Sequence, residues 1–136
     1  MFGKLKLLYK RKNYSTGTTW EKTVGYSRAV RVGNQIYIAG TTSTDNNHQI
    51  VGKGDPYKQT IQIMKNIQMA LNAVDADLQN VVRSKIYVTD IGMWSEIAKG
   101  HREFFKEIQP ACTMVEVSNL MHSDMLVEIE IDAIVF

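Results

Sequence analysis

The sequence predicts a single α+β domain, in which two helices pack on one face of a β-sheet. Short runs rich in β-branched residues alternate with two longer stretches whose apolar residues recur every three or four positions. These segments follow the order β-β-α-β-α-β-β, and two helices can cover only one face of such a sheet. The 136 residues show no internal repeat and no linker, so we expect one domain spanning 1–136.

Two short strands are expected first. The β-rich runs at 27–32 and 35–40 flank Gly33-Asn34, and both of these residues tolerate a positive φ, which predicts a tight hairpin. The polar residues 41–54 that follow are expected to form a loop.

The two helices are indicated by apolar stripes. The first helix is expected to begin at Asp55-Pro56, because Asp caps free N–H groups and Pro needs no donor at a first helical position. Its stripe comprises Tyr57, Ile61, Met64, Ile67, Leu71 and Val74. The second stripe comprises Trp94, Ile97, Ala98, His101, Phe104, Phe105 and Ile108, and Pro110 ends that helix. Between the helices, the alternating β-branched residues 81–88 predict a strand.

The last two strands are expected at 112–117 and 125–136. In the final strand the odd-numbered residues are apolar and share one face. The even-numbered face mixes large apolar side chains with acids, namely Leu126, Glu128, Glu130, Asp132, Ile134 and Phe136. Such a face is neither a normal core nor a normal wet surface. We therefore expect copies of the same chain to cover it, which predicts a homo-oligomer.

Composition and charge exclude several classes of protein. Hydrophobic residues make up 44% and charged residues 22% of the chain, which excludes intrinsic disorder and collagen. No stretch approaches the ~18 uninterrupted apolar residues of a membrane-spanning helix. The single cysteine, Cys112, excludes an internal disulfide. With no signal-peptide pattern, these features predict a cytoplasmic protein with no membrane partner.

Positive charge is concentrated at the N-terminus. The net charge is +2, yet five cations precede the first acid, Glu21, and these are Lys4, Lys6, Lys10, Arg11 and Lys12. The remainder of the chain is mildly acidic. Residues 1–23 are expected to form an irregular basic lead-in that is solvated, rather than bound to RNA or a membrane.

The acids of the last strand are the strongest candidates for chemistry. Glu128, Glu130 and Asp132 lie side by side at every second position. If they are partly buried, mutual repulsion and desolvation raise at least one pKa toward the range of a general acid or base. The alternative is that they face water or form salt bridges between subunits.

Other reactive residue types give weaker signals. The histidines at 48, 101 and 122 are dispersed and form no metal-ligand spacing with Cys112, so no metal site is expected. His101 lies on an apolar stripe, which favours a hydrogen-bonded core or interface histidine over a ligand or base. Cys112 has no cation next to it in sequence to lower its pKa, which favours a buried structural thiol over a nucleophile.

Several segments, in the right order, resemble the RidA/YjgF family, the reactive-intermediate deaminases, also labelled endoribonuclease L-PSP. The resemblance covers residues 24–135. It is carried by VGYSRAVRVGNQIYIAG (24–40), QTIQIMKNIQMAL (59–71), VVRSKIYVTDI (81–91), HREFF (101–105) and PACTMVEVSNL with LVEIEIDAI (110–134).

The resemblance implies a chorismate-mutase-like fold and a homotrimer around a central barrel, with three clefts at subunit boundaries. The implied partner is a small-molecule metabolite, because archetypal members hydrolyse enamines and imines derived from amino acids. It implies no metal and no bound cofactor. In that chemistry an arginine forks onto the substrate carboxylate, a glutamate on the last strand handles water, and a tyrosine lines the pocket.

Carried over residue by residue, the resemblance is partial and indicates a divergent subgroup. Tyr26 matches the pocket tyrosine, Asp124 matches a family acid, and Glu128 matches the water-handling glutamate and is the candidate catalytic residue. Three polar groups are replaced, the clamp arginine by Cys112, a serine by Ala39 and, by spacing, an asparagine by Ala98. The candidate substrate-binding residues are Tyr26, Ala39, Cys112 and Thr113.

Loss of the clamp arginine predicts weak imino-acid deamination, unless Arg28, Arg31 or Arg83 reaches the cleft. Three functions stay open at this point. The chain is a hydrolase or deaminase of small imines or enamines, a non-catalytic metabolite-binding protein, or an RNA-directed ribonuclease or translation inhibitor. The mildly acidic body and the lack of an aromatic-plus-basic RNA motif argue against the third, so nucleic acid is not an expected partner.

Overall fold

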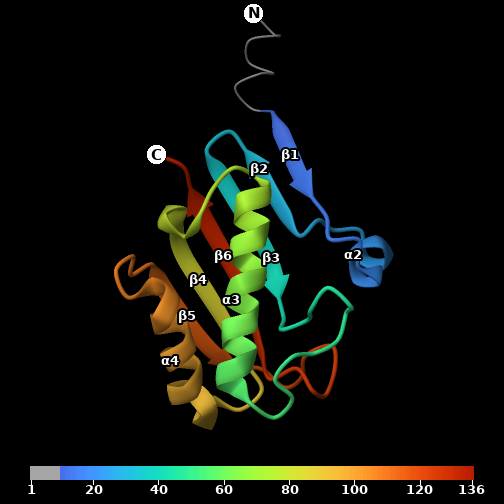
Figure 1. Cartoon of the computed structure of the whole chain (residues 1–136), viewed down its shortest axis with the longest axis vertical. Coiled ribbons are helices and arrows are strands. Elements are labelled where there is room, and N and C mark those ends of the chain that lie inside the picture. The colour runs from blue at the N-terminus through green and yellow to red at the C-terminus, as the bar shows by residue number, and fades with distance from the viewer. Residues whose placement is uncertain (1–9) are drawn as a thin grey trace, which may run out of the picture.

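The computed structural model describes residues 10–136, which form a six-stranded sheet and a layer of helices (Figure 1). The strands are β1 (Arg11–Tyr14), β2 (Ala29–Val32), β3 (Gln35–Thr41), β4 (Val81–Val88), β5 (Ala111–Glu116) and β6 (Val127–Ile134). The helices are α2 (Thr19–Val24), α3 (Pro56–Ala73) and α4 (Trp94–Phe105), with short 3-10 turns at Leu78–Asn80 and Ile91–Met93. The strand order is β1-β2-β3-β6-β4-β5, and only the β4–β5 pair is parallel.

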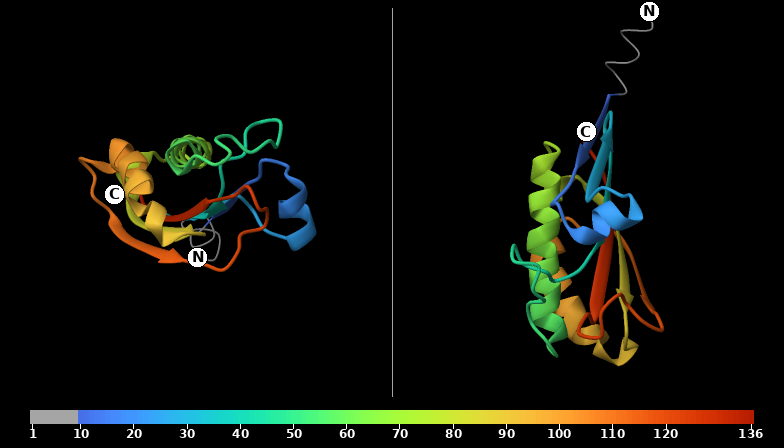
Figure 2. Two further views of the ribbon diagram at one scale, coloured as in Figure 1. Left: turned by 90° about the horizontal axis from the view of Figure 1, so that it is seen from below. Right: turned by 90° about the vertical axis from the view of Figure 1, so that its right-hand side faces the viewer.

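Helices α3 and α4 cover one face of the sheet, and within residues 10–136 no helix lies on the opposite face over β4 and β6 (Figure 2). The predicted α+β arrangement is therefore confirmed. The core lies between the sheet and the two helices, and every odd-numbered residue of β6 is buried in it. Its largest fully buried side chains include Ile36, Ile63, Met64, Ile67, Leu71, Ile86, Ile97, Ile129 and Ile131.

Local sequence signals set the main turns. Strands β2 and β3 form the predicted hairpin. Gly33, in the turn between them, has the left-handed φ of 59° that this tight turn requires. Asp55 caps α3 by accepting a hydrogen bond from the backbone N of Lys58, as predicted. The two helices approach closely at Gly100, where a Cβ atom would lie only 2.9 Å from Cβ of Thr60.

Some boundaries differ from those predicted. The last strand is shorter than 125–136, and α4 ends at Phe105, several residues before Pro110. The apolar stripe predicted for the second helix includes Trp94, but the Trp94 side chain is 58% exposed. It is the first residue of α4 and precedes Ile97, the first buried residue of that helix.

The prediction that residues 1–23 form an irregular lead-in is wrong for Arg11–Tyr14, which form β1, and for residues 19–23, which lie in α2. Strand β1 pairs with β2 and extends the sheet by one strand. Helix α2 is capped by the side chain of Thr18 and ends at Gly25, whose φ is 87°. A four-residue strand and a six-residue helix carry too little hydrophobic periodicity to be recognised. The cations at positions 4 and 6 lie outside the described residues. Among residues 10–136, no helix is long and apolar enough to cross a membrane.

Candidate functional site

Glu128 lies in β6 and faces the open side of the sheet. Its side chain is half-buried, and burial raises its pKa above the ordinary value of 4.5. The positive charge of Arg28 opposes this rise, and the negative charge of Glu130 adds to it. No hydrogen bond from residues 10–136 reaches its carboxylate. The predicted rise of a pKa among the three acids is thus confirmed, with burial rather than mutual repulsion as the main cause.

A β-bulge in β3 makes room for this carboxylate. The register between β3 and β6 shifts between Ile38 and Thr41, so that Ala39 and Gly40 together oppose a single residue of β6. A Cβ atom on Gly40 would lie 2.9 Å from Cδ of Glu128. Glycine at position 40 therefore leaves the Glu128 carboxylate in place, and Ala39 lies in the same bulge.

Arg28 reaches this bulge from the segment before β2. Its Nη1 donates to the carbonyl oxygen of Gly40 at 2.5 Å and to Oγ1 of Thr41 at 3.2 Å. Its Nη2 donates to the hydroxyl oxygen of Tyr26 at 3.1 Å. The guanidinium carbon also lies 5.4 Å from the centre of the Tyr26 ring. One of the three arginines considered as replacements therefore enters the site, and it holds the predicted pocket tyrosine there.

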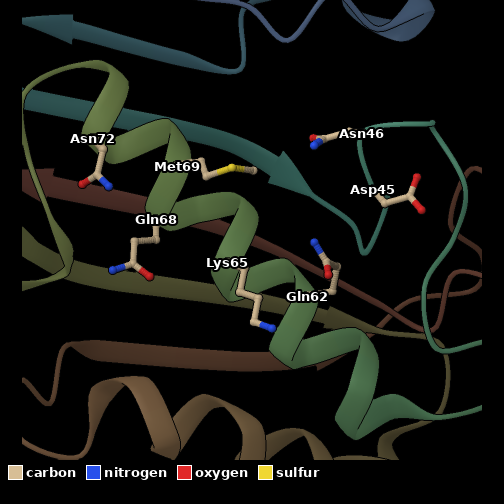
Figure 3. Close-up of a pocket in the computed structure, with 7 residues that line it drawn as sticks. All are labelled: Asp45, Asn46, Gln62, Lys65, Gln68, Met69 and Asn72. Atoms are coloured by element: carbon tan, nitrogen blue, oxygen red, sulfur yellow. The ribbon is translucent and has the colours of Figure 1, made fainter.

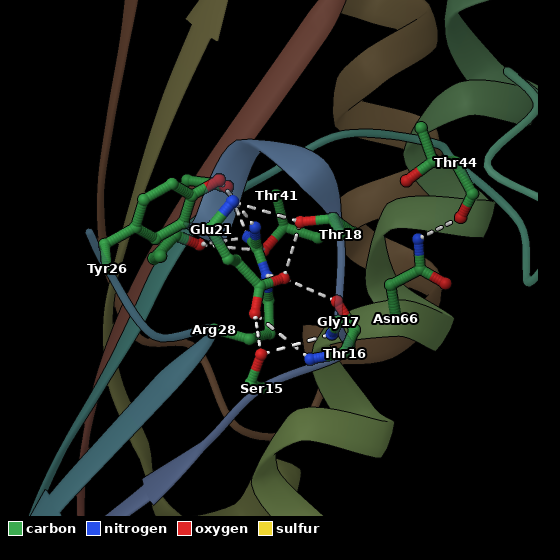
Figure 4. Close-up of polar contacts among 12 residues, drawn as sticks. Ser15, Thr16, Gly17, Thr18, Glu21, Tyr26, Arg28, Thr41, Thr44 and Asn66 are labelled. Carbon is green, nitrogen blue, oxygen red and sulfur yellow. Dashed lines mark hydrogen bonds and ion pairs between the residues drawn. The ribbon is translucent and has the colours of Figure 1, made fainter. Parts of the chain in front are cut away.

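Glu21 is the counter-ion of Arg28 (Figure 4). Its side chain is 2% exposed, and Oε2 lies 3.7 Å from Nε of Arg28. The carboxylate accepts hydrogen bonds from the hydroxyls of Ser15, Thr16 and Thr18 at 2.6, 2.5 and 2.9 Å. Burial alone would raise the pKa of Glu21, but these hydrogen bonds outweigh burial and hold the pKa below 4.5. Glu21 is therefore a buried acid that stays charged.

Tyr26 and Glu128, both candidates from the sequence, lie near Arg28, whereas Glu21 was not among the candidates. A signal was present, because Thr18 and Glu21 have the three-residue spacing of a helix capping box. The hydroxyl-rich run before Glu21 is the source of its hydrogen bonds. A run of this composition predicts an irregular segment, and its sequence does not indicate that Glu21 pairs with an arginine.

Cys112 and Thr113 lie on β5, at the far edge of the sheet from β1. Two strand spacings, roughly 10 Å, separate β5 from β6. Cys112 lies opposite Ser84, which is buried on the helix-covered side, whereas Glu128 faces the open side. One chain therefore does not bring Cys112 together with Glu128. The prediction of a buried thiol is wrong, since Cys112 is exposed on an edge strand.

The open face between these two groups is lined with paired polar residues. The Tyr87 hydroxyl donates to Glu130, and Nε of Arg83 lies 3.8 Å from Oδ2 of Asp132. The hydrogen bond to Glu130, together with burial, raises the pKa of Tyr87 to about 12. The same face carries the exposed apolar side chains of Tyr37, Val115 and Ile134. The mixed acidic and apolar face predicted for the last strand is thus present.

The remaining predicted residues lie elsewhere. Nε2 of His101 lies 2.8 Å from Oγ of Ser84, and burial lowers the pKa of His101, which confirms a hydrogen-bonded core histidine. Arg31 does not enter the site, because its Nη1 donates to the carbonyl oxygen of Val74 at 2.8 Å. Asp124 pairs with Lys53, 3.7 Å away. Within residues 10–136, no cluster of three or more His, Cys, Asp or Glu side chains could hold a metal ion.

Two shallow pockets lie on the helix layer rather than at this site. One, of about 450 Å³, lies between α3 and the loop before it and is lined by Asp45, Asn46, Gln62, Lys65, Gln68, Met69 and Asn72 (Figure 3). The other, of about 520 Å³, is lined by Ser95, Ala98, Lys99, Arg102, Glu103 and Lys106. Apart from Ala98, neither contains a residue predicted from the resemblance. The bulge beside Glu128 is the better candidate, because it combines a carboxylate of raised pKa with a fixed cation.

Comparison with known proteins agrees with the resemblance. The family model described as endoribonuclease L-PSP matches residues 16–135. A RutC family protein of Pyrococcus abyssi is 36% identical over 110 residues, covering 80% of this chain and 86% of that protein. Rv2704 of Mycobacterium tuberculosis, a member of the YjgF/YER057c/UK114 family, superimposes on this chain with a TM-score of 0.84 at 42% sequence identity. The match covers 93% of this chain and 100% of the Rv2704 chain. A Rid family protein of unknown function from Yersinia pestis has a TM-score of 0.75 at 33% sequence identity. That match covers 81% of this chain and 87% of the Yersinia chain. The chain therefore belongs to the RidA/YjgF family, and its fold is the chorismate-mutase-like fold of that family.

Proposed function

We propose that this protein is a homotrimer whose inter-subunit clefts hydrolyse small reactive imines or enamines. The observation that carries the proposal is the Glu128 carboxylate. It is half-buried, has a raised pKa, and accepts no hydrogen bond from residues 10–136. An acid placed in this way is available to exchange a proton with a bound water.

The proposed reaction uses water and one carboxylate. The water oxygen bonds to the imine carbon while Glu128 accepts a water proton, and this proton then passes to the imine nitrogen. Glu128 then takes the hydroxyl proton of the resulting carbinolamine and delivers it to the amino nitrogen. As the C–N bond breaks, this nitrogen leaves as ammonia and the oxygen forms the carbonyl. An enamine first gains a proton on carbon and becomes the imine. The net change is imine plus water to carbonyl compound plus ammonia.

The separation of the two residue groups on one chain supports an assembly of several copies. Tyr26, Arg28 and Glu128 lie around the β3 bulge, while Cys112 and Thr113 lie on the opposite edge strand. A head-to-tail ring of three copies would place the edge strand of one copy beside the bulge of the next. It would also cover the mixed open face.

The test is to generate in situ an imine that lacks a carboxylate, such as one derived from an amino-acid amide, and to follow its decay with and without the protein. We expect the protein to accelerate decay and Glu128→Gln to lose the acceleration. Glu103→Gln is the control, because it makes the same carboxylate-to-amide change on the helix layer, where Glu103 accepts the hydroxyl bond of Tyr57. Decay at the buffer rate, or equal rates for wild type and Glu128→Gln, would exclude the hydrolase. Ligand-induced stabilisation without consumption would instead favour a binding protein.

The description endoribonuclease L-PSP raises RNA as a second candidate substrate. The open face argues against it, because Glu128, Glu130 and Asp132 all project from β6 there. Three carboxylates on one strand repel a phosphate backbone. We therefore rank RNA cleavage below imine hydrolysis.

A further inference from the structure

We propose that Arg28 is an internal cation rather than a carboxylate clamp, and that the cleft is consequently selective for imines and carbonyl compounds that lack a carboxylate. This inference rests on the proposed function and names the substrate class for the same site. It is drawn from the contacts of Arg28, Glu21 and Tyr26.

The guanidinium of Arg28 is already committed to the protein. Nη1 donates to the Gly40 carbonyl oxygen and to Thr41 Oγ1, and Nη2 donates to the hydroxyl oxygen of Tyr26. The Nε edge faces Glu21. A bidentate grip on a substrate carboxylate needs two parallel N–H groups on one edge of the guanidinium. The edge of the guanidinium that includes Nε faces Glu21, and the edge that includes Nη1 is bonded to Gly40 and Thr41. Neither edge therefore has two free N–H groups for a substrate carboxylate.

The charge of Arg28 is also balanced inside the protein. The Arg28 side chain is 12% exposed and the Glu21 side chain 2%, so the pair is largely shielded from water. Turning Arg28 toward a ligand would leave the Glu21 carboxylate buried without its counter-ion and the Gly40 carbonyl without its donor. Both losses oppose such a movement. With the Arg28–Glu21 pair neutral, Glu128 gives this part of the cleft a negative charge whenever it is ionised, which repels a carboxylate.

Tyr26 supplies the contact that an uncharged ligand needs. Its hydroxyl oxygen accepts from Arg28, so its own proton remains free to donate. A neutral carbonyl or amide oxygen is a suitable acceptor, and the adjacent cation strengthens the phenol as a donor. Arg28 thus acts as a positioning residue for Tyr26, and the two residues together define specificity.

The test compares two ligands of the same skeleton, 2-oxobutanoate and 2-oxobutanamide, which differ in carboxylate against carboxamide. Binding to the full-length protein is measured by NMR titration. We expect the carboxamide to bind about tenfold more tightly, the usual effect of one charged interaction. In Glu21→Gln the counter-charge is lost and the positive charge of Arg28 is no longer balanced. The ratio of carboxamide affinity to carboxylate affinity should therefore fall to roughly threefold or less. Glu103→Gln is the control and should keep the wild-type ratio.

The possible results bear differently on this inference and on the proposed function. Tighter binding of the carboxylate by the wild type would overturn the inference alone. Saturable binding of neither ligand would overturn both. If Glu21→Gln does not fold, Arg28→Gln replaces it. A clamp would then lose about tenfold in carboxylate affinity, whereas an internal cation would leave the carboxylate the weaker ligand and would mainly weaken the carboxamide, through Tyr26.

Discussion

The two halves of the candidate site differ in how completely one chain builds them. Around the β3 bulge, Arg28 has a hydrogen-bonded or charged partner for each of its three nitrogens, and Glu21 accepts from three hydroxyls. On β5, by contrast, Cys112 is exposed and lies at the edge of the sheet. The first half is assembled by folding, and the second half needs something beyond the single chain to become part of a cleft.

This difference separates two kinds of acid on one protein. Glu21 is buried with its partners and has a lowered pKa, whereas Glu128 is half-buried without hydrogen bonds and has a raised pKa. The first acid is held by partners within the chain, and the second is the acid to which we assign the proposed chemistry. Substitutions in the two groups should therefore have opposite signatures in stability and activity.

The largest expected effect is on stability at Glu21. Glu21→Ala removes the counter-ion of Arg28 and leaves three hydroxyl donors without an acceptor. We expect a loss of about 3 kcal/mol in the free energy of unfolding, typical of a broken buried pair. Glu128→Gln should be neutral or stabilising at pH 7, because it removes a charge that burial disfavours. Urea unfolding of both variants measures this contrast, and equal losses would refute it.

The next largest effect is on activity at Gly40. In Gly40→Ala the added Cβ would meet the end of the Glu128 side chain, which is flexible and can move aside. We expect stability to change by less than about 1 kcal/mol while imine hydrolysis falls roughly tenfold to a hundredfold, because the carboxylate is displaced. An Ala variant with unchanged activity would show that the position of Glu128 against the bulge does not matter.

A smaller effect, a gain in activity, is expected from a substitution of Cys112 on β5. Cys112→Arg restores a cation on β5, where the resemblance places the clamp arginine. Activity on imines that carry a carboxylate should rise by about tenfold, while Cys112→Ser should change neither activity nor stability measurably. If Cys112→Arg has no effect on carboxylate-bearing substrates, β5 does not line the cleft.

The smallest effect is on the pH dependence of stability. Glu128 has a folded pKa above 4.5, so it stabilises the folded state fully below pH 4.5, and this contribution is lost as pH rises through its folded pKa. Glu21 has a folded pKa below 4.5, so its contribution is present above pH 4.5 and is lost as pH falls through that pKa. Unfolding curves between pH 3 and pH 7 should show Glu128→Gln gaining on the wild type as pH rises. Glu21→Gln should instead approach the wild type at low pH.

Elements with strong hydrophobic periodicity can be predicted from the sequence. Features that depend on contacts between distant segments cannot. The alternation in β6 and the Asp55-Pro56 start of α3 are readable because each depends on neighbouring residues. The register shift at Ala39-Gly40 depends on the pairing of β3 with β6, about ninety residues later, and periodicity carries no sign of it. The partnership of Glu21 with Arg28 likewise depends on the turn that joins α2 to β2 and on the hydroxyls of Ser15, Thr16 and Thr18 around the carboxylate. The lack of a cation next to Cys112 in sequence favours a buried thiol, but its exposure depends on which strand lies at the edge of the sheet.

The central claim is that the bulge of one copy meets β5 of another, and the single native cysteine allows a direct test. Wild-type chains carrying a nitroxide on Cys112 are mixed and refolded with ¹⁵N-labelled Cys112→Ser chains, so that any paramagnetic broadening in the labelled chains comes from a different subunit. The account predicts that the amide signals of Gly40 and Glu128 lose intensity, while those of residues on the outer face of α3 do not. Full intensity at Gly40 and Glu128 would contradict it.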